Sequence, residues 1–255
     1  MSPEPFHGLP LDEAARAQLV AAAGVLTTLG RVFTEAGHEL SLVGGPVRDA
    51  LLGRLSPTAD LDLTTDAHPE AVLSLLERYA ETTWDVGIRF GTVGARIQGR
   101  EVEITTYRAE QYDPDSRKPD VDFGDNLDDD LVRRDFTINA MAIRLPELQF
   151  VDLFGGLEDL AAGMIRTPGT PQDSFGDDPL RMLRAARFVS QLEFGVADRV
   201  RAAIVAMASQ LGRITVERVA GLPMSCSSAA HRRTRSCSPS SSSAMAWRST
   251  VSECW

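Results

Sequence analysis

The stretch that decides the fold is Leu42-Val43-Gly44-Gly45-Pro46-Val47-Arg48-Asp49, which is followed shortly by Asp60-Leu61-Asp62. The apolar residues before Gly44 predict a strand, and Pro46 favours the first turn of a helix after it. Glycines at a strand end let phosphate oxygens approach the backbone, and Arg48 lies where it can contact the same phosphates. The alternatives are a tight turn at the glycines and an ion pair between Arg48 and Asp49. Since no Gly-Lys-Ser/Thr follows, this is not a Walker-type loop.

Two carboxylates follow on the next predicted strand. Asp60 and Asp62 are two residues apart, so their side chains share one face of that strand. Ionised carboxylates this close repel each other, and a Mg²⁺ ion, which prefers carboxylate and phosphate oxygens, would relieve the repulsion. Glu103, on another predicted strand, is a possible third carboxylate ligand. The alternative for all three residues is a solvated strand face.

Three further motifs follow in order: residues 133–142 (RRDFTINAMA), 152–160 (DLFGGLEDL) and 177–188 (DDPLRMLRAARF). In the last motif, Asp178, Arg181, Arg184 and Arg187 recur every three residues, as on a slanting ridge of one helix. Aspartate only accepts and arginine only donates hydrogen bonds, so together they could recognise the edge features that cytosine and adenine share. The alternative is a helix surface with ion pairs three residues apart.

The four motifs together resemble the class II tRNA nucleotidyltransferases, which are the CCA-adding enzymes and bacterial poly(A) polymerases of the polymerase-β-like superfamily. The resemblance covers roughly residues 25–219 and implies an α+β fold, with a mixed-sheet nucleotidyltransferase head followed by a helical neck. It also implies transfer of CMP and AMP from CTP and ATP to the 3′ end of tRNA through two Mg²⁺ ions. Poly(A) addition by the same fold, or a catalytically impaired nucleotide-binding remnant of a disrupted gene, stays open.

The resemblance also assigns roles to residues. Asp60 and Asp62 are implied as the catalytic metal ligands, with Glu103 as a possible addition. The residues implied in nucleotide binding are Gly44, Gly45 and Arg48 at the triphosphate, Arg134 and Asp135 at the ribose and phosphates, Asp178 and Arg181 at the base, and Arg184 and Arg187 at the triphosphate.

We expect a head domain over residues 1–165, a truncated helical neck over 166–220 and a disordered tail over 221–255. The tail is rich in Ser and Arg and contains all three cysteines, without zinc-ligand spacing. It is either a natural tail or the product of out-of-frame translation. In the family, a helical body that grips the tRNA follows the neck, and its absence makes turnover by this chain uncertain.

The composition is that of a globular protein, with 43% hydrophobic and 24% charged residues. The net charge of −10 argues against nucleic-acid binding by bulk charge, and the only arginine cluster outside the motifs is Arg232, Arg233 and Arg235. We therefore expect weak tRNA binding. Neither a secretory signal nor a membrane span is evident, so the expected compartment is the cytoplasm.

Periodicity predicts the remaining elements. Helices are expected at 11–36, 47–52, 68–79, 137–142, 179–192 and 196–211, strands at 39–43, 60–64, 82–86, 92–97, 102–107 and 150–153, and a mobile loop at 109–130.

Overall fold

The computed structural model describes residues 13–84, 88, 91–109, 122–124, 126–215 and 218. The chain forms two compact units: the first comprises residues 1–134 and 138–157, and the second comprises 135–137 and 158–255. The domain limits expected from the sequence stay predictions. Residues 221–255, where a disordered tail is expected, lie outside the described residues.

The first unit is built on a seven-stranded sheet with the order β3-β4-β5-β2-β1-β8-β9. Only β2 and β5 run parallel, whereas the other neighbouring strands are antiparallel, so the sheet is mixed. The α+β fold with a mixed sheet is thereby confirmed. The strands are β1 (Leu40–Val43), β2 (Leu61–Thr65), β3 (Thr82–Trp84), β4 (Thr92–Ile97), β5 (Arg100–Thr106), β8 (Met141–Leu145) and β9 (Gln149–Asp152), and β6 (Arg108–Ala109) pairs separately with β7 (Asp122–Phe123).

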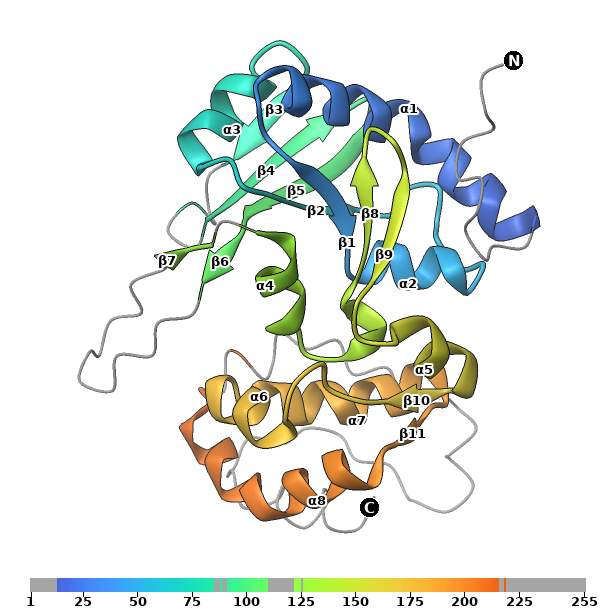
Figure 1. The fold of residues 1–255 in the computed structure, drawn as a ribbon, viewed down its shortest axis with the longest axis vertical. Helices are drawn as coiled ribbons and strands as arrows, with labels where there is room; N and C mark the ends of the chain where they lie inside the picture. Colours follow the sequence, from blue (N-terminus) through green and yellow to red (C-terminus); the bar gives the residue numbers. More distant parts are fainter. Residues whose placement is uncertain are drawn as a thin grey trace, which may run out of the picture. The chain divides into compact units, whose positions relative to one another are not determined.

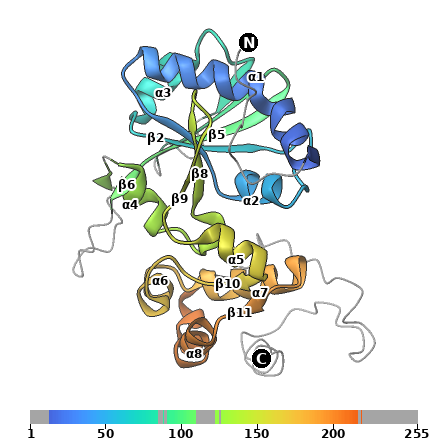
Figure 2. The same ribbon diagram turned by 45° about the vertical axis from the view of Figure 1, so that its right-hand side comes forward.

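One face of this sheet is apolar and is covered by helices. Alternation along the strands places Leu42, Leu63 and Ile104 on this face, where all three are buried. Helices α1 (Glu13–Glu35) and α3 (Pro69–Leu76) lie on one side of the sheet (Figures 1 and 2). Helix α2 (Gly45–Leu51) follows β1 directly. The polar residues of the strands are therefore left to the opposite face.

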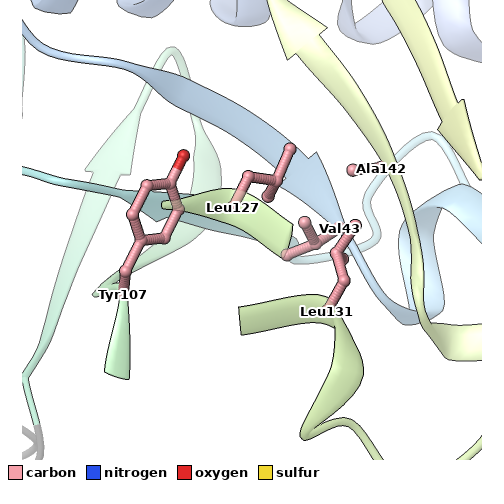
Figure 3. Close-up of a cluster of buried hydrophobic side chains, with 5 residues drawn as sticks. All are labelled: Val43, Tyr107, Leu127, Leu131 and Ala142. Carbon is pink, nitrogen blue, oxygen red and sulfur yellow. The ribbon is translucent and has the colours of Figure 1, made fainter. Parts of the chain in front are cut away.

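Helix α4 (Leu127–Val132) covers part of the opposite face. It contributes to a small buried cluster of Val43, Tyr107, Leu127, Leu131 and Ala142 (Figure 3). Asn126 caps this helix, because its side-chain oxygen accepts a hydrogen bond from the backbone N–H of Asp129 at 2.9 Å. The cluster covers the part of the face formed by β1 and β8.

The second unit is mainly helical. Helix α7 buries Met182, Ala185 and Phe188, which recur every three residues on one side. The rings of Phe188 and Phe136 are perpendicular, with their centroids 5.7 Å apart. Its elements are α5 (Gly156–Ala162, which begins in the first unit), β10 (Met164–Ile165), α6 (Pro171–Asp177), α7 (Leu180–Leu192), β11 (Gly195–Val196), α8 (Asp198–Met207) and the 3₁₀ helix η3 (Ala208–Arg213).

Two sequence-based expectations are wrong. The helix expected at 137–142 is a single 3₁₀ turn, Thr137–Asn139, followed by strand β8. Its apolar residues are buried all round, and a short buried run does not distinguish helix from strand. The loop expected at 109–130 contains β7 and the start of α4, while residues 110–121 and 125 lie outside the described residues.

None of the helices in the described part of the chain is both long enough and apolar enough to cross a membrane.

Candidate nucleotide and metal site

Two carboxylates lie on the polar face of the sheet in the first unit, and a third lies near them. Asp62 lies on β2 and is in register with Glu103 on the parallel strand β5, and Asp60 immediately precedes β2. Asp62 is half-buried, whereas Asp60 and Glu103 are exposed. Strand pairing thus brings Asp62 and Glu103 to one face, and Asp60, just before the strand, is near enough to raise the pKa of Asp62.

Negative charge on this face exceeds the positive charge near it. Burial, together with the neighbouring carboxylates of Glu103 and Asp60, raises the pKa of the Asp62 carboxyl to about 6, although Arg134 and Arg48 oppose the rise. The two arginines therefore compensate the negative charge only in part. A divalent cation would supply the missing positive charge, so the donor set fits Mg²⁺.

The carboxylates alone do not complete a metal site. Among the residues that the structure describes, no three acidic, histidine or cysteine side chains are grouped closely enough to hold a metal ion. Mg²⁺ is typically bound by one or two carboxylates, with phosphate oxygens and water as its other ligands. The arrangement therefore fits a metal that arrives with a phosphate-bearing substrate.

The turn between β1 and α2 lies against the same carboxylate. Gly44 has a positive φ of 71°, which favours glycine. A Cβ at Gly44 would lie 3.1 Å from Nη1 of Arg134 and 3.7 Å from Oδ2 of Asp62. Gly44 therefore lets the guanidinium group of Arg134 and the carboxylate of Asp62 come close to the backbone of the turn.

Arg48 is held by two neighbours. Its Nη2 lies 2.7 Å from Oδ1 of Asp49, and its Nη1 donates to Oδ1 of Asn139 at 2.7 Å. The ion pair with Asp49, the alternative left open by the sequence, is thus present. It does not exclude phosphate binding, since a guanidinium group carries five donors. Asn139 was not expected here, although it lies within the RRDFTINAMA motif.

Arg134 has one paired and one unpaired donor group among the described residues. Its Nη2 donates to Oδ2 of Asp130 at 2.9 Å, whereas its buried Nε has no hydrogen-bond partner in the described part of the chain. An unpaired buried donor costs free energy, so a partner is expected there. Asp130 is a second residue that the sequence analysis missed; it belongs to the acidic run at the start of α4.

In the second unit, Asp135 and Arg184 form a tight ion pair. Oδ2 of the buried Asp135 lies 2.7 Å from Nε and 2.6 Å from Nη2 of Arg184, and Oδ1 accepts the backbone N–H of Phe136. Arg184 therefore links Asp135 to helix α7. On the same helix, the guanidinium group of Arg187 lies 5.0 Å from the ring centroid of Phe188.

Asp178 and Arg181 do not share a helix. Asp178 lies between α6 and α7 with an extended backbone, so only the three arginines of the expected ridge are on α7. Oδ1 of Asp178 accepts the backbone N–H of Leu180 at 3.1 Å, and Oδ2 accepts from Nη2 of Arg218 at 3.1 Å. Arg181 donates to Oγ of Ser174 at 2.9 Å.

The chain is similar to known proteins over most of its length. The sequence profile of the Poly A polymerase head domain matches residues 40–166. Residues 40–166 belong to this family. A CCA-adding enzyme from Lactobacillus helveticus is 47% identical over 201 residues, which are 78% of this chain and 48% of that enzyme. This chain spans about half the length of the curated relatives that it matches.

The similar solved structures are also CCA-adding enzymes. The Bacillus stearothermophilus CCA-adding enzyme in complex with CTP is similar, with a TM-score of 0.67 and 39% identity over 79% of this chain and 46% of that one. The Thermotoga maritima CCA-adding enzyme complexed with tRNA has a TM-score of 0.60 and 30% identity over 75% of this chain and 43% of that one.

The DLFGGLEDL motif of this poly A polymerase head-domain protein has a structural role. The carboxylate of Asp152 accepts the backbone N–H groups of Gly156 and Leu157 at 2.8 and 2.9 Å and so caps the start of α5. The buried Asp159 accepts from Oγ1 of Thr137 at 2.7 Å and lies 3.2 Å from Nη1 of Arg166. Both aspartates therefore use their oxygens to hold the backbone and neighbouring side chains.

Proposed function

We propose that this chain is the nucleotidyltransferase part of a CCA-adding enzyme, which transfers CMP and AMP from CTP and ATP to the 3′ end of tRNA. The observation that carries the proposal is the under-neutralised carboxylate group around Asp62, next to Gly44 and Arg134. The relatives that share this part of the chain are CCA-adding enzymes.

The residues of the first unit would bind the triphosphate and the metal. Arg48 and Arg134 provide guanidinium groups for phosphate oxygens, and the buried Nε of Arg134 would gain a partner. Asp60 and Asp62 would hold Mg²⁺, which lowers the pKa of a hydroxyl and stabilises the charge on diphosphate when it is bound. The 3′ oxygen of the RNA then bonds to the α-phosphorus, the bond from that phosphorus to diphosphate breaks, and the hydroxyl proton leaves to solvent.

The second unit would choose the base. Asp178 and Arg181 place an acceptor and a donor near the start of α7. Cytosine and adenine both present an amino group beside a ring nitrogen, so the pair suits both bases and disfavours uracil and guanine. Arg218 already occupies one oxygen of Asp178, which leaves the remaining lone pairs for the base.

The test is transfer to a tRNA that lacks its CCA end. We expect incorporation of C with CTP alone and completion with CTP and ATP together, and the Asp62→Asn variant is the inactive control. Repeated addition of A from ATP alone would instead favour poly(A) addition, the second candidate, which the name of the matched head domain supports. Binding of Mg²⁺–CTP without any transfer would identify a catalytically impaired remnant.

A further inference from the structure

A single row of register partners crosses four neighbouring strands on the carboxylate face. Trp84 on β3 is opposite Gly94 on β4, Gly94 is opposite Glu103 on β5, and Glu103 is opposite Asp62 on β2. Partners in register point to the same side of a sheet. Trp84 is therefore on the same face as the candidate metal ligands, at the edge of the sheet.

The indole of Trp84 lies on the backbone of Gly94. A Cβ built at Gly94 would overlap the pyrrole ring of Trp84, and Gly94 is buried although it has no side chain. The ring therefore lies over β4, two strand spacings, or about 10 Å, from Asp62. A side chain at position 94 would displace the ring from the sheet. Glycine therefore lets the indole pack directly on the strand, where it is half-buried.

The two sides of Asp62 differ in chemistry. Toward β1 lie Gly44, Arg48 and Arg134, which suit phosphates. Toward β5 lie the exposed Glu103 and then Trp84, and the nearest cation on β4, Arg96, is paired with Glu101 at 2.7 Å. An acidic and aromatic surface disfavours a triphosphate but accepts a neutral base, whose flat face can stack on an indole.

We propose that Trp84 is a stacking platform for the base at the 3′ end of the RNA acceptor. The inference rests on the proposed function, because that function requires an acceptor hydroxyl at the carboxylates. The terminal base of such an acceptor changes with each nucleotide added. Stacking tolerates this change because every base has an aromatic face, whereas hydrogen bonds to base edges would not. Trp84 is thus a positioning residue.

Steady-state kinetics of the full chain provide the first test. Trp84→Ala should raise the KM for the RNA acceptor about tenfold and leave the KM for CTP unchanged, whereas Trp84→Phe should retain most of the acceptor affinity. Gly94→Ala should act like Trp84→Ala, because it displaces the ring. Tyr79→Ala removes another exposed aromatic of the first unit and is the control without effect. Equal acceptor KM values for Trp84→Ala and the parent would overturn the proposal.

A binding test separates this inference from the proposed function. With Trp247 and Trp255 changed to Phe, Trp84 is the only tryptophan. A single-stranded oligoribonucleotide ending in a 3′-deoxynucleotide should quench its fluorescence at low ionic strength, and less so in Gly94→Ala. Absence of quenching while Mg²⁺–CTP still binds would refute the platform alone. Failure of the parent chain to bind Mg²⁺–CTP would refute the proposed function.

Discussion

The sequence assigns binding roles both to the charged residues around Asp62 and to those around α7, but the two groups differ in how far their charges are neutralised in the structure. Around Asp62, negative charge exceeds the local positive charge, and the pKa of Asp62 rises to about 6. Around α7, the carboxylates of Asp135 and Asp178 each have an ion pair, with Arg184 and Arg218 respectively. The first group is destabilising until a ligand binds, whereas the second already contributes to the fold.

This difference indicates that the charges around Asp62 lower the stability of the ligand-free protein and are kept for function. Unpaired charge on a half-buried carboxylate is costly, and such groups persist at sites that bind a cation or perform chemistry. Matched pairs need no ligand to be stable. The comparison therefore yields predictions in which removal of a charged group has opposite effects on stability: it stabilises the first unit at Asp62 and destabilises the second at Arg184.

The largest expected effect is that of Asp62→Asn. Removing this carboxylate should abolish nucleotide transfer, a loss of at least about 1,000-fold, because a metal ligand is gone. The same substitution should raise the melting temperature at pH 7.5, since the raised pKa means that the folded state disfavours the ionised form. Asp60→Asn, at an exposed position, should abolish transfer with little change in stability. Transfer within tenfold of the parent would contradict the metal assignment.

The pH dependence of this gain has a defined sign. Between about pH 4 and pH 6 the unfolded chain releases the Asp62 proton while the folded chain retains it, so stability of the parent falls as pH rises. Asp62→Asn lacks this titration, and its advantage should therefore grow over that range and stay constant above it. Urea unfolding at several pH values measures the difference. An advantage that is equal at pH 4 and pH 7 would show that charge is not its cause.

The next effect is the loss of stability in Arg184→Ala. This variant leaves the buried carboxylate of Asp135 without its ion pair, and we expect the free energy of unfolding to fall by about 2–3 kcal/mol. The double variant Arg184→Ala/Asp135→Asn should recover part of the loss, because the unpaired charge is removed. Unchanged stability with a raised KM for CTP would instead make Arg184 a triphosphate ligand, as the family resemblance implies.

A smaller effect is expected on the choice of nucleotide. Asp178→Ala should reduce discrimination of CTP and ATP against UTP and GTP about tenfold, since the base loses one hydrogen-bond partner. Arg218→Ala removes the ion-pair partner but keeps the carboxylate, so it should retain discrimination. Competition assays with all four nucleotides measure both. Equal losses in the two variants would mean that the ion pair, and not the carboxylate itself, matters.

Much of the first unit could be predicted from the sequence because its signals are local. The strand, glycine turn and carboxylate pair follow from residue types at fixed spacing, and β4 was predicted at its observed limits. The helix expected at 137–142 includes the first two residues of strand β8, because Met141–Leu145 is largely buried and lacks the alternation that would identify a strand. A period-two hydrophobic pattern is visible only where one face of a strand is buried and the other is exposed, and β8 has no exposed face.

The partners of the site residues could not be predicted, because they depend on contacts between distant segments. Asn139 reaches Arg48 from 91 residues away, and Arg184 reaches Asp135 from 49 residues away. Asp178 was placed on the helix by its three-residue spacing to Arg181, but its carboxylate accepts the N–H of Leu180 and it precedes the helix. Spacing alone does not show where a helix begins.

The smallest expected effect concerns tRNA, and it tests whether the cations of residues 222–255 contribute. Residues 222–255 contain four arginines and one glutamate, so the rest of the chain has a net charge of −13. Affinity for a polyanion comes largely from counterion release by clustered cations, and Arg232, Arg233 and Arg235 form the only such cluster outside the motifs. We therefore expect tRNA to bind only at low ionic strength, and deletion of residues 222–255 should remove most of this binding.

The slope of log affinity against log salt should become shallower by about 2, the value for three phosphate contacts on a single strand. Changing the three arginines to serine in the full chain is the matched control and should give the same change in slope. Tight tRNA binding at physiological salt by the deleted chain would show that residues 1–221 hold the RNA themselves.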